Sequence, residues 1–331
     1  MKSDELLLLT SREIKSLLTL DECIQAVEQA FRLYGEGKAA PPGVLSMHTR
    51  DGGFHIKAGL LDLDRSYFAA KINGNFPKNA TRFGLPTIQG VIVLCDSGNG
   101  TPLAVMDSRE ITSSRTGAAT AVAARYLARP DSRSITICGC GNQGRIQLKA
   151  ISRVCRLQTV FAFDTNGDQA VRFSHELASE LNFPVTPVSD LASAVRQSDI
   201  CVTCTLSRQP FLGRDEVRPG TFVAAVGADN PEKQELHPSL MVNSKIVCDI
   251  IEQCAVMGDL HHALDAGVVT RADVHAELAE IVAGKKPGRE SEEEITIFDS
   301  TGMALQDVAA AVLVYEKAQH EGSGVRLNLA A

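Results

Sequence analysis

Between residues 133 and 300, short apolar runs alternate regularly with helical segments. The run SITIC precedes a helical segment over 143–153, and TVFAFD precedes one over 170–181. A helical segment over 189–196 precedes DICVTCT, and the apolar runs TFVAAVG, KIVCDI and ITIFDS follow. Short apolar strands that alternate with helices are typical of a parallel sheet with both faces covered. The region therefore predicts an α/β fold with a doubly wound parallel sheet.

A glycine-rich turn links the first strand of this region to its helix. Gly139, Gly141 and Gly144 fit the pattern G-x-G-x-x-G, which gains meaning here because it follows a strand and opens a helix. The first glycine permits a tight turn, the second lets the backbone approach a pyrophosphate, and the third lets helix and strand pack closely. A phosphate then lies at a helix N-terminus, where N–H groups favour it. We expect these glycines, Asn142 and Gln143 to bind a dinucleotide; the alternative is a purely structural turn.

The next strand of the alternation, TVFAFD, ends in Asp164. An acid at this place can accept hydrogen bonds from the ribose hydroxyls, and it repels the additional phosphate of NADP. Arg172, further along the chain, is expected to face solvent on a helix. The sequence therefore predicts a Rossmann-type domain with NAD as its cofactor. A structural glycine turn would leave the position of Asp164 to chance.

The first third of the chain has a different pattern. An amphipathic helix is expected over 20–34, followed by a meander of the strands FHIKAGLL, SYFAAKIN and GVIVLCD. The segment DSGNG before TPLAVMD is a hairpin signal. A small-residue helix over 113–127 leads into the alternating region, and a final helix is expected over 307–319. The chain should thus contain a nucleotide domain and a second, split α+β domain.

Composition limits the partners and the location. Forty acidic against 33 basic residues give a net charge of −7, which argues against nucleic acid or an anionic membrane surface. No apolar run approaches the roughly 20 residues of a spanning helix, and MKSDELLLLTSREIKS is not typical of a signal peptide. The nine cysteines form no regular set of pairs, so reduced thiols and a cytoplasmic location are expected.

Two motifs that resemble metal or redox sites receive structural interpretations. Cys201 and Cys204 form C-x-x-C, but the surrounding DICVTCTL is typical of a buried strand, and no second pair at zinc spacing accompanies it. His261 and His262 are adjacent, so their side chains diverge and cannot easily share a metal. No metal is predicted.

Several segments together resemble the ornithine cyclodeaminase and mu-crystallin family, which also contains archaeal-type alanine dehydrogenases and cyclic-imine reductases. The resemblance covers nearly the whole chain and rests on AAKINGNFPKN, LPTIQGVIVLCD, SSRTGAATAVAARYL, CGCGNQG, VGADNPEKQELHP and TIFDSTGMALQD. It implies a homodimer, with active sites in the cleft between the domains. It also implies a substrate-binding and dimerisation domain from residues 1–115 plus 305–331, and an NAD-binding domain over 116–304.

The resemblance assigns catalytic roles to two residues. Asp229, just after TFVAAVG, corresponds to the acid/base that handles the proton on nitrogen or water. The alternative is an Asx turn before Asn230. Lys71, in the strand YFAAKIN, corresponds to a lysine against the substrate carboxylate, and a lysine among apolar strand residues needs a partner. Clamping the carboxylate makes the imine a better hydride acceptor, so Lys71 is also assigned a catalytic role.

The resemblance also assigns binding roles. Arg115 corresponds to an arginine shared between substrate carboxylate and cofactor, and its planar fork suits a carboxylate. The adjoining Thr116 and Gly117 would begin a helix that could hold a phosphate; the alternative is a solvent-facing arginine at a helix start. Lys233 corresponds to a cofactor-side lysine, although a lone lysine is usually a surface charge. Residues assigned to the nicotinamide are Thr87 and the pair Ser300 and Thr301, with Thr301 also assigned to the substrate.

Two positions depart from the cyclodeaminases. An arginine near APPGVLS that holds the α-carboxylate is replaced by Gly43, and a glutamate that places the side-chain amine is replaced by His55. Lys57 lies two residues further along the same strand, so alternation puts both side chains on one face. Lys57 or Arg50 could replace the missing arginine; alternatively both point to solvent. A basic pocket edge should disfavour ornithine and favour neutral or acidic substrates.

These assignments predict an NAD(H)-dependent enzyme acting on the Cα–N bond of an α-amino or α-imino acid by hydride transfer through an imine. The VGAD motif and His55 favour an amino-acid dehydrogenase or imine reductase. The alternative is an ornithine cyclodeaminase, a lyase that forms proline and ammonia while NAD is recycled. A third possibility is a non-catalytic ligand binder such as mu-crystallin, against which the presence of Asp229 argues.

Overall fold

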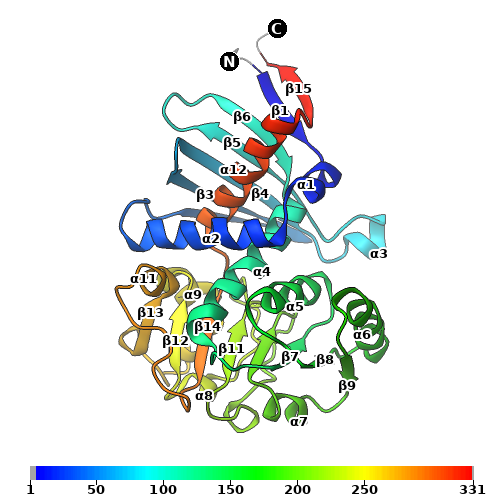
Figure 1. Cartoon of the computed structure of the whole chain (residues 1–331), viewed down its shortest axis with the longest axis vertical. Helices are drawn as coiled ribbons and strands as arrows, with labels where there is room; N and C mark the ends of the chain where they lie inside the picture. Colours follow the sequence, from blue (N-terminus) through cyan, green and yellow to red (C-terminus); the bar gives the residue numbers. More distant parts are fainter. Residues whose placement is uncertain (1–4, 330–331) are drawn as a thin grey trace. The chain divides into compact units, whose positions relative to one another are not determined.

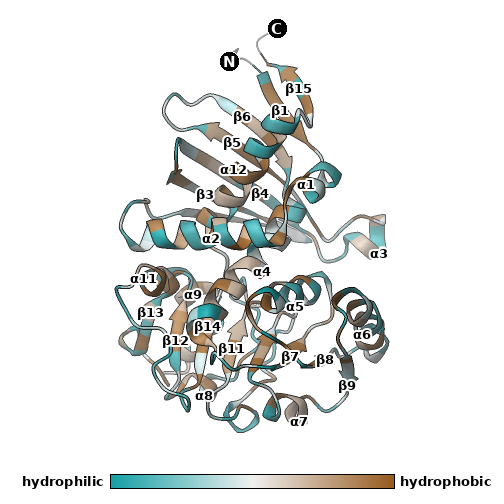
Figure 2. Cartoon of the chain, viewed as in Figure 1, coloured by the Kyte–Doolittle hydropathy of each residue, from teal (hydrophilic) through white to brown (hydrophobic). Residues whose placement is uncertain are grey.

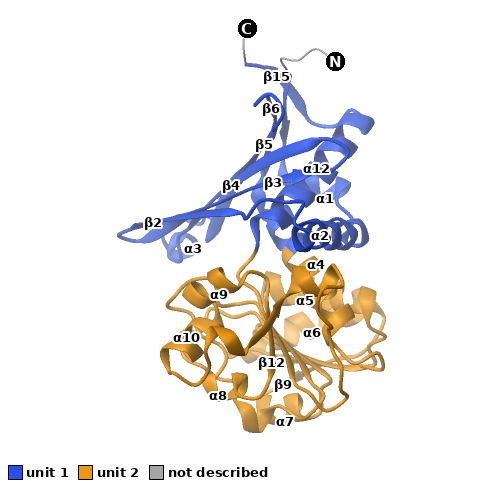
Figure 3. Ribbon diagram, turned by 90° about the vertical axis from the view of Figure 1, so that its left-hand side faces the viewer, with its two compact units in different colours: residues 1–115, 303–331 blue, residues 116–302 orange. Residues whose placement is uncertain are grey.

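The computed structural model describes residues 5–329. Residues 1–4, with which the N-terminal segment considered above begins, and residues 330–331 lie outside the described part. The chain divides into two compact units, one formed by residues 1–115 and 303–331 and the other by residues 116–302 (Figure 3). Within the described residues, no helix has both the length and the apolar character needed to cross a membrane.

The second unit is built on an eight-stranded sheet whose neighbouring strands all run parallel, in the order β13-β12-β14-β11-β10-β7-β8-β9 (Figure 1). Its strands are β7 (Ser134–Cys138), β8 (Thr159–Phe163), β9 (Val185–Val188), β10 (Ile200–Thr203), β11 (Phe222–Ala225), β12 (Lys245–Cys248), β13 (Val274–Glu277) and β14 (Thr296–Asp299). Its helices include α5 (Asn142–Val154), α6 (Gly167–Leu181), α7 (Leu191–Arg196), α8 (Pro238–Met241), α9 (Ile251–Met257), α10 (Asp259–Asp265) and α11 (Leu278–Val282).

The predicted doubly wound parallel sheet is therefore confirmed. Its central strands β10, β11 and β14 are buried along their whole length. Figure 2 shows the labelled strand β11 in brown tones, as expected of an apolar strand. The order β9-β8-β7-β10-β11 is that of a dinucleotide-binding sheet, and β14, the last strand in sequence, enters beside β11. Because the strands are parallel, the loops after their carboxyl ends lie along one edge, which is where ligands bind in such sheets.

The first unit contains a seven-stranded mixed sheet in the order β15-β1-β6-β5-β4-β3-β2. Its strands are β1 (Glu5–Leu9), β2 (Gly43–Thr49), β3 (Gly52–Asp62), β4 (Ser66–Asn75), β5 (Ile88–Asp96), β6 (Pro102–Asp107) and β15 (Val325–Asn328). The predicted meander and the hairpin between β5 and β6 are confirmed. Its helices are α1 (Ser11–Leu17), α2 (Leu20–Gly35), α3 (Asn79–Phe83) and α12 (Ala304–Glu321).

The two faces of this sheet differ in what covers them. The inner face carries α12, which packs on β3 and β4 and against α2 (Figure 1). Gly59 in β3 permits this close approach, because a Cβ there would lie 2.7 Å from Leu305 Cδ2. The outer face keeps exposed apolar side chains, which are Leu45, Met47, Phe54, Leu60, Ile72 and Val91.

Helix α4 (Ser108–Leu127) begins five residues earlier than the sequence analysis predicted. The side chain of Asp107 accepts the Arg109 N–H at 2.9 Å and takes the place of a helix cap. Thr116 and Gly117 consequently lie inside the helix, where backbone N–H groups are used in helical hydrogen bonds. The expectation that they begin a helix is wrong, and Arg115 is not a solvent-facing residue at a helix start.

Candidate active site

The glycine turn between β7 and α5 has the conformation that its pattern predicts. Gly139 has a φ of 104°, which favours glycine. A Cβ on Gly144 would lie 2.1 Å from Gly139 O, so only glycine lets α5 start this close to the strand. Gly141 is the N-cap of α5, and apart from its own chain neighbours no described atom lies within 4 Å of the place where a Cβ would stand. The backbone at the start of α5 is therefore open to an approaching group.

Asp164 lies beside this turn, directly after β8. Its Oδ2 accepts the Cys140 N–H and its Oδ1 accepts the Asn166 N–H, both at 2.9 Å. Arg172 is exposed on α6 and donates to Gln169, as expected of a solvent-facing residue. A cavity of about 730 Å³ lies against the turn. Its lining residues are Gly139, Gly141, Phe163, Asp164, Thr165, Leu191, Cys204, Thr205, Leu206, Ser207, Gln209, Pro210 and Phe211.

The loop after β11 carries Asp229, whose carboxylate is 46% exposed and pairs with Lys233 Nζ at 2.7 Å. Lys233 Nζ also donates to Gly227 O at 3.2 Å, and its carbonyl lies 2.8 Å from His262 Nε2. Lys233 is thus a fixed partner of Asp229 and not an isolated surface charge. The Asx turn considered for Asp229 is made by Asn230, whose side chain accepts the Glu232 N–H at 3.0 Å.

Glu235, which the sequence analysis did not single out, connects two loops at this edge of the sheet. Its carboxylate accepts the Gly227 N–H at 2.9 Å and the Thr205 hydroxyl at 2.7 Å. Burial raises the pKa of Glu235, while hydrogen bonds from Thr205 oppose the shift. The sequence around it, DNPEKQEL, is typical of an exposed turn and does not indicate a buried glutamate. Only the fold shows that Glu235 is buried.

Ser300 and Thr301 follow β14 and are both buried. Their hydroxyls each donate at 3.2 Å to Asp249, the residue directly after β12. Gln253 Nε2 also donates to Thr301 Oγ1 at 2.5 Å. Asp249 was missed in the sequence, although an acid directly after the apolar run KIVC is a signal for the loop edge of a parallel sheet.

In the first unit, Lys71 on β4 and Arg115 on α4 share one carboxylate. Lys71 Nζ lies 2.8 Å from both oxygens of Asp307 on α12. Arg115 Nε donates to Asp307 Oδ1 at 3.0 Å, and Arg115 Nη1 donates to Gln306 Oε1 at 2.9 Å. The exposed fractions of Lys71, Arg115 and Asp307 are only 4%, 5% and 2%. The predicted need of Lys71 for a partner is met by Asp307, a residue that the sequence analysis did not assign.

Lys57 belongs to the same cluster. It stands directly opposite Lys71 in the register of β3 and β4, so both side chains lie on the inner face. Lys57 is 8% exposed, whereas Arg50 is exposed in the turn between β2 and β3. His55 shares this face, and its Nδ1 lies 3.1 Å from Ser46 Oγ. The prediction that His55 and Lys57 share a face is confirmed, and the alternative that Lys57 points to solvent is wrong.

The charges of this cluster act on one another. The pKa of Lys71 is lowered to about 7, mainly because the side chain is buried and secondly because the positive charge of Arg115 is close. Lys57 lowers this pKa further, whereas Asp307 raises it. Burial alone would raise the pKa of Asp307, but Arg115 and Lys71 hold it below its ordinary value. Three buried cations therefore gather around one carboxylate, and a further anion would be stabilised beside them.

The sequence profile of the ornithine cyclodeaminase/mu-crystallin family matches residues 4–322. The chain belongs to this family. An alanine dehydrogenase from Archaeoglobus fulgidus is 41% identical over 325 residues, which are 98% of each chain. The structure of an archaeal alanine dehydrogenase dimer with bound NAD superposes with a TM-score of 0.93 and 41% identity, covering 98% of this chain and 99% of that one. The structure of a Δ1-pyrroline-2-carboxylate reductase from Thermococcus litoralis, in complex with NADH and L-proline, superposes with a TM-score of 0.92 and 35% identity. The match covers 97% of this chain and 100% of that one.

The remaining candidate positions from the sequence lie in both units. Gly43 begins β2, and Thr87 precedes β5, where its carbonyl accepts the Phe76 N–H at 2.9 Å. Cys201 is buried in β10, as expected, with its Sγ 3.9 Å from that of Cys138. Cys204 follows the strand. His261 pairs with Asp265 at 3.4 Å.

Proposed function

We propose that this family member is an NAD(H)-dependent oxidoreductase that acts on the Cα–N bond of an α-amino or α-imino acid, as an amino-acid dehydrogenase or an imine reductase. The proposal rests on one observation. The same chain contains a glycine-rich turn of the dinucleotide-binding type and a buried cluster of Lys57, Lys71 and Arg115, whose net positive charge suits a carboxylate. Its similarity to an alanine dehydrogenase and to a pyrroline-2-carboxylate reductase over nearly the full length supports the same reaction class.

The second unit would hold NAD(H). Gly139, Gly141 and Gly144 leave the start of α5 open to a pyrophosphate. Gln143 at the first turn of α5 has a buried Oε1 without a hydrogen-bond partner among the described residues, as expected where a bound group completes the site. Asp164 would accept the ribose hydroxyls. Further contacts with NAD(H) are proposed for Asn142, Lys233, Thr87, Ser300, Thr116 and Arg115. When bound, NAD(H) takes hydride from the substrate Cα or delivers hydride to it.

The chain's own residues would bind and orient the substrate and move its proton. Lys71 and Arg115 hold the α-carboxylate, and Arg115 uses two of its five N–H donors within the described residues. Their positive charge draws electrons away from an adjacent imine carbon. Asp229 exchanges the proton on the substrate nitrogen or on water, with Lys233 holding its carboxylate. Thr301, His55 and Lys57 are proposed to contact the substrate.

A substrate panel tests this function. Amino acids supplied with NAD, and 2-oxo acids with ammonium or cyclic imines supplied with NADH, should change the absorbance of the reduced nicotinamide. Conversion of ornithine to proline without net change in NADH would instead identify a cyclodeaminase. Binding of carboxylates and NADH with no turnover of any panel member would identify a ligand-binding protein.

Cofactor preference is a second expected result. Because Asp164 would repel the 2′-phosphate of NADP, we expect kcat/KM to be higher with NAD, by about tenfold or more for one well-placed charge. Asp164→Ser should narrow this ratio. Asp168→Ser, at an exposed acid in the first turn of α6, is the matched control and should leave the ratio unchanged. Equal use of both cofactors by the unsubstituted protein would contradict the assignment.

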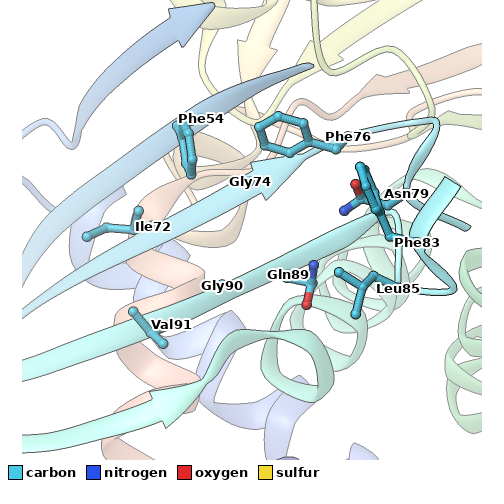
Figure 4. A pocket seen from close by; sticks show the side chains of 10 residues that line it. All are labelled: Phe54, Ile72, Gly74, Phe76, Asn79, Phe83, Leu85, Gln89, Gly90 and Val91. Carbon is cyan, nitrogen blue, oxygen red and sulfur yellow. The ribbon is translucent and has the colours of Figure 1, made fainter. Parts of the chain in front are cut away.

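The outer face of the first unit's sheet is proposed as a homodimer interface. Phe54, Ile72 and Val91 project from it, and with Phe83 and Leu85 they line a hollow that continues toward α3 (Figure 4). Phe54 and Phe76 meet edge to face there, with ring centroids 5.6 Å apart. Exposed apolar surface of this kind is typical of an interface, and an archaeal alanine dehydrogenase similar to this chain is a dimer.

A charge placed on this face should prevent association. Ile72→Glu would bury a carboxylate without a partner, so we expect this variant to be a monomer in sedimentation or light-scattering measurements, whereas the unsubstituted protein should be a dimer. Val171→Glu is the matched control, because Val171 is a similarly exposed apolar residue on α6. A dimer that survives Ile72→Glu but not Val171→Glu would place the interface elsewhere.

The expected cytoplasmic location stays a proposal. All nine cysteines lie within the described residues and are free thiols, which agrees with a reducing compartment. Absence of a metal likewise stays a prediction, which metal analysis of the purified protein would check.

A further inference from the structure

We propose that Asp307 is a positioning residue that fixes Lys71 and Arg115 side by side as one carboxylate-binding unit. The inference rests on the proposed function, in which these two cations hold the substrate carboxylate. It adds a residue from the C-terminal helix α12 to a clamp whose other members come from β4 and α4. Asp307 acts through its two partners and need not touch the substrate.

The geometry shows how one side chain fixes both cations. Asp307 accepts from Lys71 Nζ at 2.8 Å and from Arg115 Nε at 3.0 Å through the same oxygen, Oδ1. The neighbouring Gln306 accepts from Arg115 Nη1 at 2.9 Å. The guanidinium plane is thus held by two consecutive residues of α12, and its orientation is set before any ligand arrives. Preorganisation of this kind lowers the cost of binding a carboxylate.

Asp307 also has a reason to stay ionised. It lies in the first turn of α12, where the helix dipole favours an anion. The charged and titratable groups that face the cluster from the elements around it are Lys57 and His55 on β3, Lys71 on β4, Arg115 on α4, Asp307 on α12 and Cys23 on α2. Burial raises the pKa of the Cys23 thiol to about 12, so it stays neutral. Asp307 is the group whose negative charge favours the ammonium form of Lys71.

The effect of Asp307 on the pKa of Lys71 distinguishes a positioning role from a purely structural role. Removing the negative charge of Asp307 leaves three buried cations to repel one another, so the pKa of Lys71 must fall still further from its ordinary value. Lys71 then loses its proton at a lower pH, and a neutral amine attracts a carboxylate weakly. A substitution that damaged packing alone would reduce the amount of folded protein without moving a titration.

The experiment compares Asp307→Asn, Asp307→Glu and Lys71→Arg with Glu316→Gln, a control on the exposed part of the same helix. Binding of propionate, an unreactive carboxylate, is measured by calorimetry on the NADH complex as a function of pH. Asp307→Asn should weaken propionate binding about tenfold or more at neutral pH. It should also shift the alkaline loss of propionate binding to lower pH, in a variant that still forms the NADH complex. Lys71→Arg should abolish that alkaline loss, because arginine keeps its proton.

Each other outcome has a defined meaning. A pH dependence in Asp307→Asn equal to that of the unsubstituted protein, or an alkaline loss that persists in Lys71→Arg, would overturn the role of Asp307. If Asp307→Asn does not fold, Asp307→Glu provides the test of the positioning role. This variant keeps the negative charge but displaces it, so propionate binding should weaken. The pH at which binding is lost should stay the same as in the unsubstituted protein. Unchanged binding in Asp307→Glu would overturn the proposal. Failure of the unsubstituted protein to bind propionate would instead overturn the carboxylate clamp of the proposed function.

Discussion

Asp229→Asn should lower turnover by about 100- to 10,000-fold, the range expected when a positioned acid/base is lost. The asparagine keeps the size of the side chain and can still contact Lys233, so the loop after β11 should keep its conformation. The amide cannot take up or release a proton. We therefore expect kcat to fall while the Kd of NADH, measured by fluorescence titration, stays within a few-fold of the unsubstituted value.

Glu232→Gln is the matched control for this prediction. Glu232 lies on the same loop and pairs with Arg208 at the surface, with 68% of its side chain exposed. Its removal changes the net charge by the same amount and should leave kcat unchanged. Turnover of Asp229→Asn within a few-fold of the unsubstituted protein would require another residue to move the proton. Loss of NADH binding together with turnover would indicate that the loop had rearranged.

L-ornithine should be a poor substrate compared with neutral or acidic amino and imino acids. Its distal ammonium would approach Lys57, whose side chain lies on the same face of the sheet as those of Lys71 and His55. A like charge at about 4 Å and an effective dielectric of about 20 costs on the order of 4 kcal/mol. Solvent and relaxation reduce this cost, but even about 1 kcal/mol is roughly fivefold in kcat/KM.

The reciprocal substitution makes this prediction sharper. His55→Glu restores the acid that the resemblance assigns to cyclodeaminases at this place, so ornithine should improve by about fivefold or more relative to alanine. Ser46→Ala is the control, because it removes one hydrogen-bond contact of His55 and changes no charge. The panel should contain ornithine, lysine, alanine, aspartate and cyclic imines. If ornithine is the best substrate of the unsubstituted protein, the basic-pocket argument is wrong and cyclodeamination is the activity.

The fold class could be predicted from the sequence because the patterns that indicate it involve residues close together in the chain. Short buried strands and the glycine turn depend on residues close together in the chain, and Gly139 has the positive φ that the pattern required. The strands β9 and β13 were missed because VTPV contains proline and VHAE is only half apolar. The start of α4 was misplaced because SREITSS contains several residues that favour caps. Tertiary packing keeps them helical.

Local sequence patterns were enough to predict the doubly wound sheet, the glycine turn with Asp164 at the end of the next strand, and the need of Lys71 for a partner. Only the tertiary structure identified that partner as Asp307, which lies 236 residues away in the chain. The strand register likewise decided that Lys57 stands opposite Lys71. Backbone conformation follows from neighbouring residues, whereas the balance of buried charge depends on side chains that meet only after distant segments have packed together.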